Sequence, residues 1–234
     1  MPHHGAMRER FAQFRRSVGR SAEVESAGSP QLEAPPLSER RPVLLVGLGN
    51  PGDKYARSRH NVGQWCIREL ARRHNVTLTR EGRMDIGRAD IEGSRLYLGR
   101  VLSSYYNDSG GPVQGELRRL SLAPWQLLVV YDELDLPVAQ IRIRAFGGHG
   151  GNNGMRSIIA ALGSQDFARI RVGIDRPYDD GAPVREPERI ASWVLGNPPP
   201  AEREQLEAAV ARAADAIELA VAGGIEAAMS RFNP

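Results

Sequence analysis

The chain alternates strand-like and helix-like segments, and this alternation restricts its fold more than any other feature. Strand character, with short apolar runs or alternating apolar and polar residues, occurs at 43–46, 86–91, 95–102, 127–131, 140–144 and 168–174. Helical spacing of apolar residues occurs at 62–70, 153–163 and about 200–222. The last of these is expected to bury Leu206, Val210, Ala213, Ile217 and Val221. Interleaved strands and helices predict a single α/β domain.

The composition agrees with a globular domain. With 234 residues, 41% of them hydrophobic and 25% charged, the chain can bury a core and is unlike collagen, coiled coils or disordered proteins. Cys66 is the only cysteine, which excludes a disulfide framework and a zinc site with several cysteines. No apolar run approaches the roughly 18 residues that a membrane helix needs.

The basic residues are almost all arginines, because Lys54 is the only lysine among the 31 lysine and arginine residues. Arginine binds phosphate through two parallel hydrogen bonds, so a basic partner surface here would be an arginine surface. Genomic base composition is an equally simple source of this skew. The net charge of +3 permits a nucleic-acid partner but does not require one.

Residues 1–41 differ from the rest of the chain. Their first half is rich in arginine, their second half is rich in Ser, Glu, Pro and Ala, and no apolar segment of a secretory signal follows the basic start. We expect a disordered basic, Pro-rich extension over 1–41 and an ordered domain over 42–234. A transit peptide, a basic arm and an upstream extension before Met7 are the alternatives.

A glycine-rich turn follows the first strand. Residues 47–52 (Gly-Leu-Gly-Asn-Pro-Gly) match the G-x-G-x-x-G pattern of dinucleotide-binding proteins, in which a helix begins under a pyrophosphate. The polar residues 53–59 lack helical spacing, and no acidic residue ends a second strand about 20 positions on. We therefore favour a tight turn that displays Asn50, whose amide both donates and accepts hydrogen bonds.

A histidine and an aspartate are candidates for acid–base chemistry. By position, His60 before a helix and His149 in a glycine-rich loop are the candidate general bases, although a histidine before a helix is usually a capping or solvent-facing residue. Asp132 follows a buried strand, at the end where open α/β sheets bind ligands, and a carboxylate there can fix the tautomer of an imidazole. The acidic residues 132–135 could instead bind Mg²⁺, but no second acidic cluster completes such a site.

Residues 147–154 (Gly-Gly-His-Gly-Gly-Asn-Asn-Gly) form a second glycine-rich segment. Arg142 and Arg144 precede it and share one face of a strand, and Arg169 and Arg171 repeat this spacing on another strand. Arginines beside a glycine loop at a helix start favour a phosphate site, with a flexible loop and solvated arginines as the alternative.

A serine nucleophile is disfavoured. Residues 108–111 (Asp-Ser-Gly-Gly) are similar to the nucleophile segment of chymotrypsin-like proteases, but those proteins are all-β. No G-x-S-x-G elbow occurs in the chain.

Seven segments follow one another along the chain: VGLGNPG, KYARSRHNVG, YNDSGGPV, YDELDLP, GGHGGNNGM, RIRVGI and WVLGNPPP. With these segments in this order, the chain from about Val43 to Asn233 resembles the bacterial-type peptidyl-tRNA hydrolase family. Each piece alone is weak evidence, whereas the ordered set is highly specific. The resemblance implies a monomeric α/β domain with a twisted mixed β-sheet surrounded by helices. It also implies hydrolysis of the ester between a peptide and tRNA, without a metal or organic cofactor.

The resemblance also implies roles for individual residues. His60 corresponds to the catalytic histidine, Asp132 to its partner, and Asn50 to the residue that distinguishes a blocked α-amino group from a free one. Contacts with the tRNA end correspond to Tyr55, Tyr105, Asn107 and Asn153, and contacts with tRNA phosphates to Arg142, Arg144 and Arg171. The implied partner is peptidyl-tRNA. The single cysteine and the lack of an export signal make the cytoplasm the expected compartment, and no membrane partner is expected.

The chain departs from the family's motifs at two positions. Tyr106 stands where relatives commonly have methionine, and Asn152 stands where many have histidine. A phenol could narrow the cleft or offer a new hydroxyl, and an asparagine cannot take up a proton as histidine does.

The mechanism we expect is general-base attack by water. Asp132 orients His60, His60 takes a proton from water, and the amides of Asn50 and Asn107 stabilise the oxyanion. The alternative is a catalytically weak or inactive tRNA- or RNA-binding descendant of the family.

Overall fold

The computed structural model describes residues 33–102 and 104–234. Its main sheet has the strand order β2-β3-β4-β1-β5-β7-β6. These strands are β1 (Leu44–Gly47), β2 (Thr79–Glu81), β3 (Met84–Ile91), β4 (Ser94–Val101), β5 (Leu127–Glu133), β6 (Ile141–Arg144) and β7 (Ala168–Gly173). A separate two-stranded sheet pairs β8 (Tyr178–Asp179) with β9 (Ala182–Pro183).

The sheet is mixed, with parallel strands at its centre. β1 lies parallel to both β4 and β5, and β5 lies parallel to β7, whereas β2, β3 and β6 pair in antiparallel fashion. The carboxyl ends of β1 and β5 are therefore neighbours, because Gly47 is in register with Val130. This is the edge of an open α/β sheet at which ligands bind.

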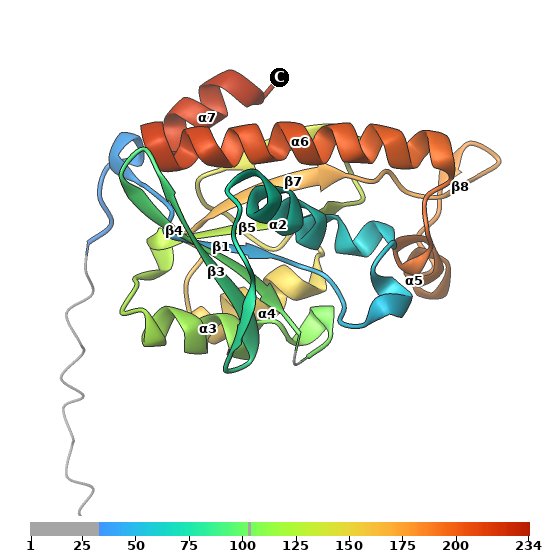
Figure 1. Ribbon diagram of the computed structural model, residues 1–234. Coiled ribbons are helices and arrows are strands. Elements are labelled where there is room, and N and C mark those ends of the chain that lie inside the picture. The colour runs from blue at the N-terminus through green and yellow to red at the C-terminus, as the bar shows by residue number, and fades with distance from the viewer. Residues whose placement is uncertain (1–32, 103) are drawn as a thin grey trace, which may run out of the picture. The chain divides into compact units, whose positions relative to one another are not determined.

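Helices cover both faces of the sheet (Figure 1). They are α2 (Val62–Arg73), α3 (Gly110–Arg119), α4 (Asn153–Leu162), α5 (Pro187–Leu195), α6 (Pro200–Gly223) and α7 (Ile225–Phe232). α2, α6 and α7 share one apolar core with one face of the sheet, and α3 and α4 share a second core with the other face. The predicted α/β class is confirmed. None of the described helices has the length and apolar character of a membrane span.

Apolar periodicity predicted most of these elements. The expected inner face of α6 is buried throughout, from Leu206 to Val221. The sequence pattern missed α3, whose first residues, Gly110, Gly111 and Pro112, are poor helix formers. Packing supports this helix instead, because the Gly110 N–H donates to Ser157 Oγ of α4 over 2.9 Å.

A close helix–strand approach places His60 at the sheet edge. A Cβ atom on Gly63 would lie 2.3 Å from the carbonyl oxygen of Val130, so only glycine lets the first turn of α2 pack this closely on β5. The preceding 3₁₀ turn (Arg59–Asn61) is held by Arg59, whose guanidinium forms two hydrogen bonds with Glu202 of α6 and stacks on Trp193. The backbone around His60 is therefore fixed from three sides.

The chain packs against the domain before Pro42, the residue at which we expected order to begin. Arg40 forms an ion pair with Asp166, and its carbonyl oxygen accepts a hydrogen bond from the Ile225 N–H. Residues 1–32 of the predicted extension lie outside the described residues.

Candidate active site

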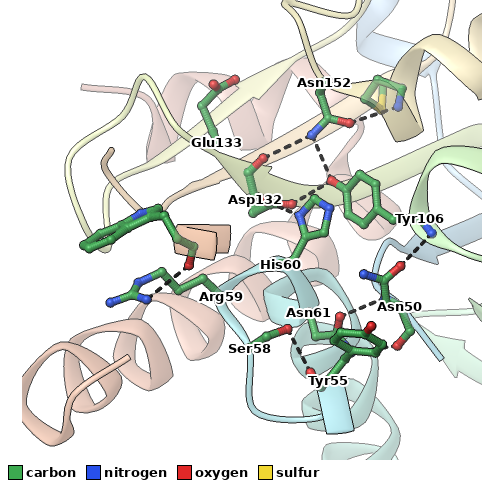
Figure 2. Close-up of polar contacts among 12 residues, drawn as sticks. Asn50, Tyr55, Ser58, Arg59, His60, Asn61, Tyr106, Asp132, Glu133 and Asn152 are labelled. Carbon is green, nitrogen blue, oxygen red and sulfur yellow. Dashed lines mark hydrogen bonds and ion pairs between the residues drawn. The ribbon is translucent and has the colours of Figure 1, made fainter. Parts of the chain in front are cut away.

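His60 and Asp132 meet at the carboxyl end of β5. His60 Nδ1 lies 2.8 Å from Asp132 Oδ2, although the two residues are 72 positions apart (Figure 2). The carboxylate is 3% exposed and the imidazole 17% exposed. An ionised Asp132 accepts the Nδ1 proton, which leaves Nε2 as the basic nitrogen at the accessible side of the ring.

Asn50 is held in one orientation next to this pair. Its Oδ1 accepts a hydrogen bond of 2.8 Å from the Tyr106 N–H. The side-chain amide therefore cannot flip, because Nδ2 is a donor and would face the same N–H. Asn61 fixes the backbone of Asn50 from both ends, accepting from its N–H over 2.8 Å and donating to its carbonyl over 2.9 Å. Nδ2 has no hydrogen-bond partner among the described residues, and Figure 2 shows it on the His60 side of the amide. Two N–H donors are thus available to a substrate.

Tyr106 contacts both members of the pair. Its hydroxyl donates to Asp132 Oδ1 over 2.6 Å, and its ring stacks on the His60 imidazole with 3.5 Å between centroids. Burial, and next the negative charge of Asp132, raise the pKa of the Tyr106 phenol well above its usual value. The phenol is therefore neutral and remains a donor.

The acidic residues at the end of β5 and just after it do not converge on one point. Asp132 faces His60, Glu133 pairs with Arg171 over 3.0 Å, and Asp135 forms an ion pair with Arg176. Burial raises the pKa of Glu133, an effect that the nearby Arg171 opposes. The described residues contain no cluster of three or more His, Cys, Asp or Glu side chains suited to a metal ion.

The other candidate catalytic groups are engaged elsewhere. His149 Nδ1 accepts a hydrogen bond from the Gly151 N–H, and within the described residues it has no carboxylate partner. Ser109 is buried and its hydroxyl donates to the Tyr106 carbonyl. Gly52 has φ of 90° and leads into a 3₁₀ turn (Asp53–Tyr55) rather than an α-helix, unlike a dinucleotide-binding loop.

The residues expected to contact the tRNA end are sequence neighbours of residues that form the site: Tyr105 and Asn107 flank Tyr106, Asn153 follows Asn152, and Tyr55 lies in the turn after Asn50. Tyr105 is 62% exposed, and Asn107 is exposed on the 3₁₀ turn Tyr106–Asp108. Asn153 is exposed at the first position of α4, and Tyr55 is half-buried in the turn after Asn50. Their roles in binding stay predictions.

The four arginines of β6 and β7 lie opposite one another but differ in environment. Arg142 is in register with Arg171 and Arg144 with Arg169. Arg169 is buried, and its guanidinium donates to the carbonyl oxygens of Gly148, Gln165 and Phe167, so it supports the glycine-rich loop. Arg171 is paired with Glu133, whereas Arg142 and Arg144 have no acidic partner among the described residues. Arg142 and Arg144 are thus the best candidates for phosphate binding.

Sequence reasoning missed Asn61, and it identified Asn152 as a departure from the family motifs without its place in the site. Asn61 holds Asn50, and the only signal for it is its position between His60 and α2. Asn152 caps α4 by accepting from the Met155 N–H over 3.0 Å, and its Nδ2 donates to the Tyr106 hydroxyl over 2.8 Å. An asparagine three residues before an apolar helical position is a cap signal that sequence can supply.

Comparison with known proteins agrees with this geometry. The family model for peptidyl-tRNA hydrolase matches residues 44–234. The peptidyl-tRNA hydrolase of Roseiflexus castenholzii is 45% identical over 192 residues, which cover 81% of this chain and 86% of that protein. That of Leifsonia xyli is 46% identical over 193 residues, covering 81% of this chain and 96% of that protein.

Solved structures give the same result. The crystal structure of peptidyl-tRNA hydrolase from Acinetobacter baumannii has a TM-score of 0.75 and 35% identity, and the match covers 83% of this chain and 95% of that chain. The fold, the whole-domain sequence match and the site at the carboxyl end of β5 agree: the chain belongs to the peptidyl-tRNA hydrolase family.

Proposed function

We propose that this chain, as a peptidyl-tRNA hydrolase, cleaves the ester between peptide and tRNA by general-base catalysis with His60 as the base. The observation that carries the proposal is the 2.8 Å contact between His60 Nδ1 and the buried Asp132 carboxylate. It leaves Nε2 free to take a proton from water. The hydroxide equivalent attacks the ester carbonyl, and the 3′ oxygen of the tRNA leaves with a proton.

Asn50 is the proposed oxyanion donor. Its Nδ2 is preoriented, because Oδ1 and the backbone are both fixed, and preoriented donors stabilise developing charge without reorganising. The same N–H groups can donate to the carbonyl oxygen of an N-blocked substrate. Asn107 has no hydrogen bond that fixes its amide among the described residues, so its contribution depends on the bound substrate.

The test of the function is deacylation of N-acetyl-aminoacyl-tRNA. We expect the wild-type protein to cleave this substrate and to leave an aminoacyl-tRNA with a free α-amino group largely intact. Binding of tRNA without cleavage of the acetylated substrate would instead support the RNA-binding alternative.

The oxyanion assignment is tested by Asn50→Asp. The carboxylate keeps the acceptor for the Tyr106 N–H but removes both N–H donors and places a negative charge near the oxyanion. We expect kcat to fall at least about 10²–10³-fold, the usual cost of one oxyanion donor. Thermal unfolding checks that the fold is kept, and a kcat within tenfold of wild type would contradict the assignment.

The phosphate-binding role of Arg142 and Arg144 predicts a change in salt dependence. In the double variant Arg142→Gln/Arg144→Gln, the slope of log(kcat/KM) against log[salt] should become shallower by about one for each arginine removed. Arg212→Gln, on the exposed side of α6, is the control and should leave the slope unchanged. An unchanged slope in the double variant would mean that other residues carry the phosphates.

We also propose that the protein acts as a monomer in the cytoplasm. All the side chains that form the site come from one chain, so a single copy completes it. Light scattering coupled to gel filtration tests the monomer.

A further inference from the structure

Tyr106 contacts both members of the His60–Asp132 pair: its hydroxyl donates to Asp132, and its ring stacks on His60. The two oxygens of Asp132 have separate partners: Oδ2 faces His60 over 2.8 Å and Oδ1 accepts from the Tyr106 hydroxyl over 2.6 Å. The carboxylate is thus held between an imidazole and a phenol, as Figure 2 shows. Two bonds in different directions leave Asp132 little freedom to rotate.

A second residue directs the Tyr106 proton. The phenol oxygen accepts a hydrogen bond of 2.8 Å from Asn152 Nδ2. Asn152 cannot turn its amide, because its Oδ1 already accepts from the Met155 N–H at the start of α4. With a donor fixed on its oxygen, the phenol points its single proton at Asp132.

The Tyr106 ring is also held on both sides. One face stacks on the His60 imidazole at an interplanar angle of 13°. Toward α4, a Cβ atom on Gly154 would lie 2.5 Å from a ring carbon of Tyr106, so the ring fits only because residue 154 is glycine. The ring is 3% exposed and forms a flat support for the base.

The two departures from the family's motifs are therefore in direct contact. By the resemblance described above, Tyr106 stands where relatives commonly have methionine, which has no hydroxyl to donate, and Asn152 stands where many have histidine. Together they form a chain of hydrogen bonds from the N-terminus of α4 through the phenol to Asp132. A methionine at position 106 could neither complete this chain nor hold Asp132 Oδ1.

We infer that Tyr106 is a positioning residue of the reaction, which holds Asp132 with its hydroxyl and His60 with its ring, and that Asn152 orients that hydroxyl. The inference rests on the proposed function of His60 as base. The hydrogen bond from Tyr106 shares the negative charge of Asp132, so less of that charge stabilises a protonated His60. The base of this chain is thus held in place by the Asp132 carboxylate and by the Tyr106 ring.

The charged and titratable groups around the hydroxyl are few. Asp132 contributes the largest charge effect on it, and Tyr131 of the same strand a smaller one. His60 faces the ring from the turn before α2, and from the α4 side the contact is the uncharged amide of Asn152. Glu133, the next residue of β5, is paired with Arg171. A change in titration after loss of the hydroxyl is thus assigned to Asp132 and His60.

The experiment compares wild type with Tyr106→Phe, which keeps the ring and removes the hydroxyl. NMR follows the titration of the His60 imidazole, and deacylation of N-acetyl-aminoacyl-tRNA gives the pH profile of kcat/KM. We expect both the NMR midpoint and the acid limb of the profile to move up by about 0.5–1 pH unit. A hydrogen bond to an ionised group changes an equilibrium constant roughly tenfold or more. When the Tyr106 hydroxyl is removed, part of this free energy goes into stabilising the protonated form of His60 by Asp132.

Two further variants make the test specific. Asn152→Ser keeps a helix cap but removes the amide donor to the Tyr106 hydroxyl, so it should shift both midpoints in the same direction as Tyr106→Phe, but by less. In the double variant with Tyr106→Phe, Asn152→Ser should cause no further shift. Tyr131→Phe, which removes another buried hydroxyl of β5, should leave both midpoints unchanged.

The outcomes separate this inference from the proposed function. Unchanged midpoints in Tyr106→Phe, or a fall in kcat that is equal at every pH, would overturn the positioning role. A shifted His60 midpoint in a protein that does not cleave the ester would support the contact and contradict the function instead.

Discussion

Replacing Asp132 by asparagine is expected to lower kcat/KM for N-acetyl-aminoacyl-tRNA by about 10²–10⁴-fold, the range that a positioned general base supplies. An asparagine amide can donate to His60 Nδ1, which moves the imidazole proton to Nε2 and removes the base. The variant also loses the negative charge that stabilises the imidazolium formed during attack. The side-chain shape is kept, and the Tyr106 hydroxyl still finds an acceptor, so the fold should persist.

The matched control is Asp135→Asn. Asp135 follows the same strand and pairs with Arg176, but its side chain is 64% exposed and it does not contact His60. We expect kcat/KM of this variant to stay within about twofold of wild type, because exposed ion pairs contribute little. If Asp132→Asn also kept more than a tenth of the wild-type value, Asp132 would not be the partner of the base.

The sequence predicted the sheet well where burial alone decides the structure. The apolar run 127–131 has the length and the β-branched residues of a buried strand, and β5 lies in the interior of the sheet. The pattern did not predict that β5 continues through Asp132 and Glu133. These carboxylates remain in a buried strand because each has a partner, His60 and Tyr106 for the first and Arg171 for the second.

The site was predictable only in part, because its contacts join distant segments. The proximity of His60 and Asp132 depends on β1 and β5 being neighbours, and the sequence pattern does not determine the order of the strands. Tyr106 and Asn152 each stood out as a departure from the family motifs. Their mutual contact spans 46 positions and follows from the packing of α4 beside the turn at Tyr106.

The four arginines of β6 and β7 were also predictable only in part. The two-residue period indicated that Arg142 and Arg144 share one face of their strand and that Arg169 and Arg171 share one face of theirs. The register of β6 on β7 places all four on the same face of the sheet. Spacing does not reveal what each guanidinium contacts. Arg169 supports backbone carbonyls and Arg171 neutralises Glu133, so two of four equivalent positions serve the fold.

His60→Ala removes the base itself, and we expect it to lower the catalytic rate as much as Asp132→Asn does. The loss should be about 10²–10⁴-fold in turnover, because water then attacks without proton removal while Asn50 still binds the carbonyl. Asp132 keeps its hydrogen bond from Tyr106, and the turn that carries residue 60 is fixed by Arg59. Thermal unfolding and tRNA binding should therefore stay close to wild type.

The most direct measurement is the single-turnover rate of N-acetyl-aminoacyl-tRNA cleavage, with enzyme in excess, for wild type and His60→Ala. Because binding is saturated, this rate reports the chemical step. We predict a rate at least about 100-fold lower in the variant. A folded His60→Ala protein that cleaves the ester within a few-fold of the wild-type rate would contradict the assignment of His60 as the base.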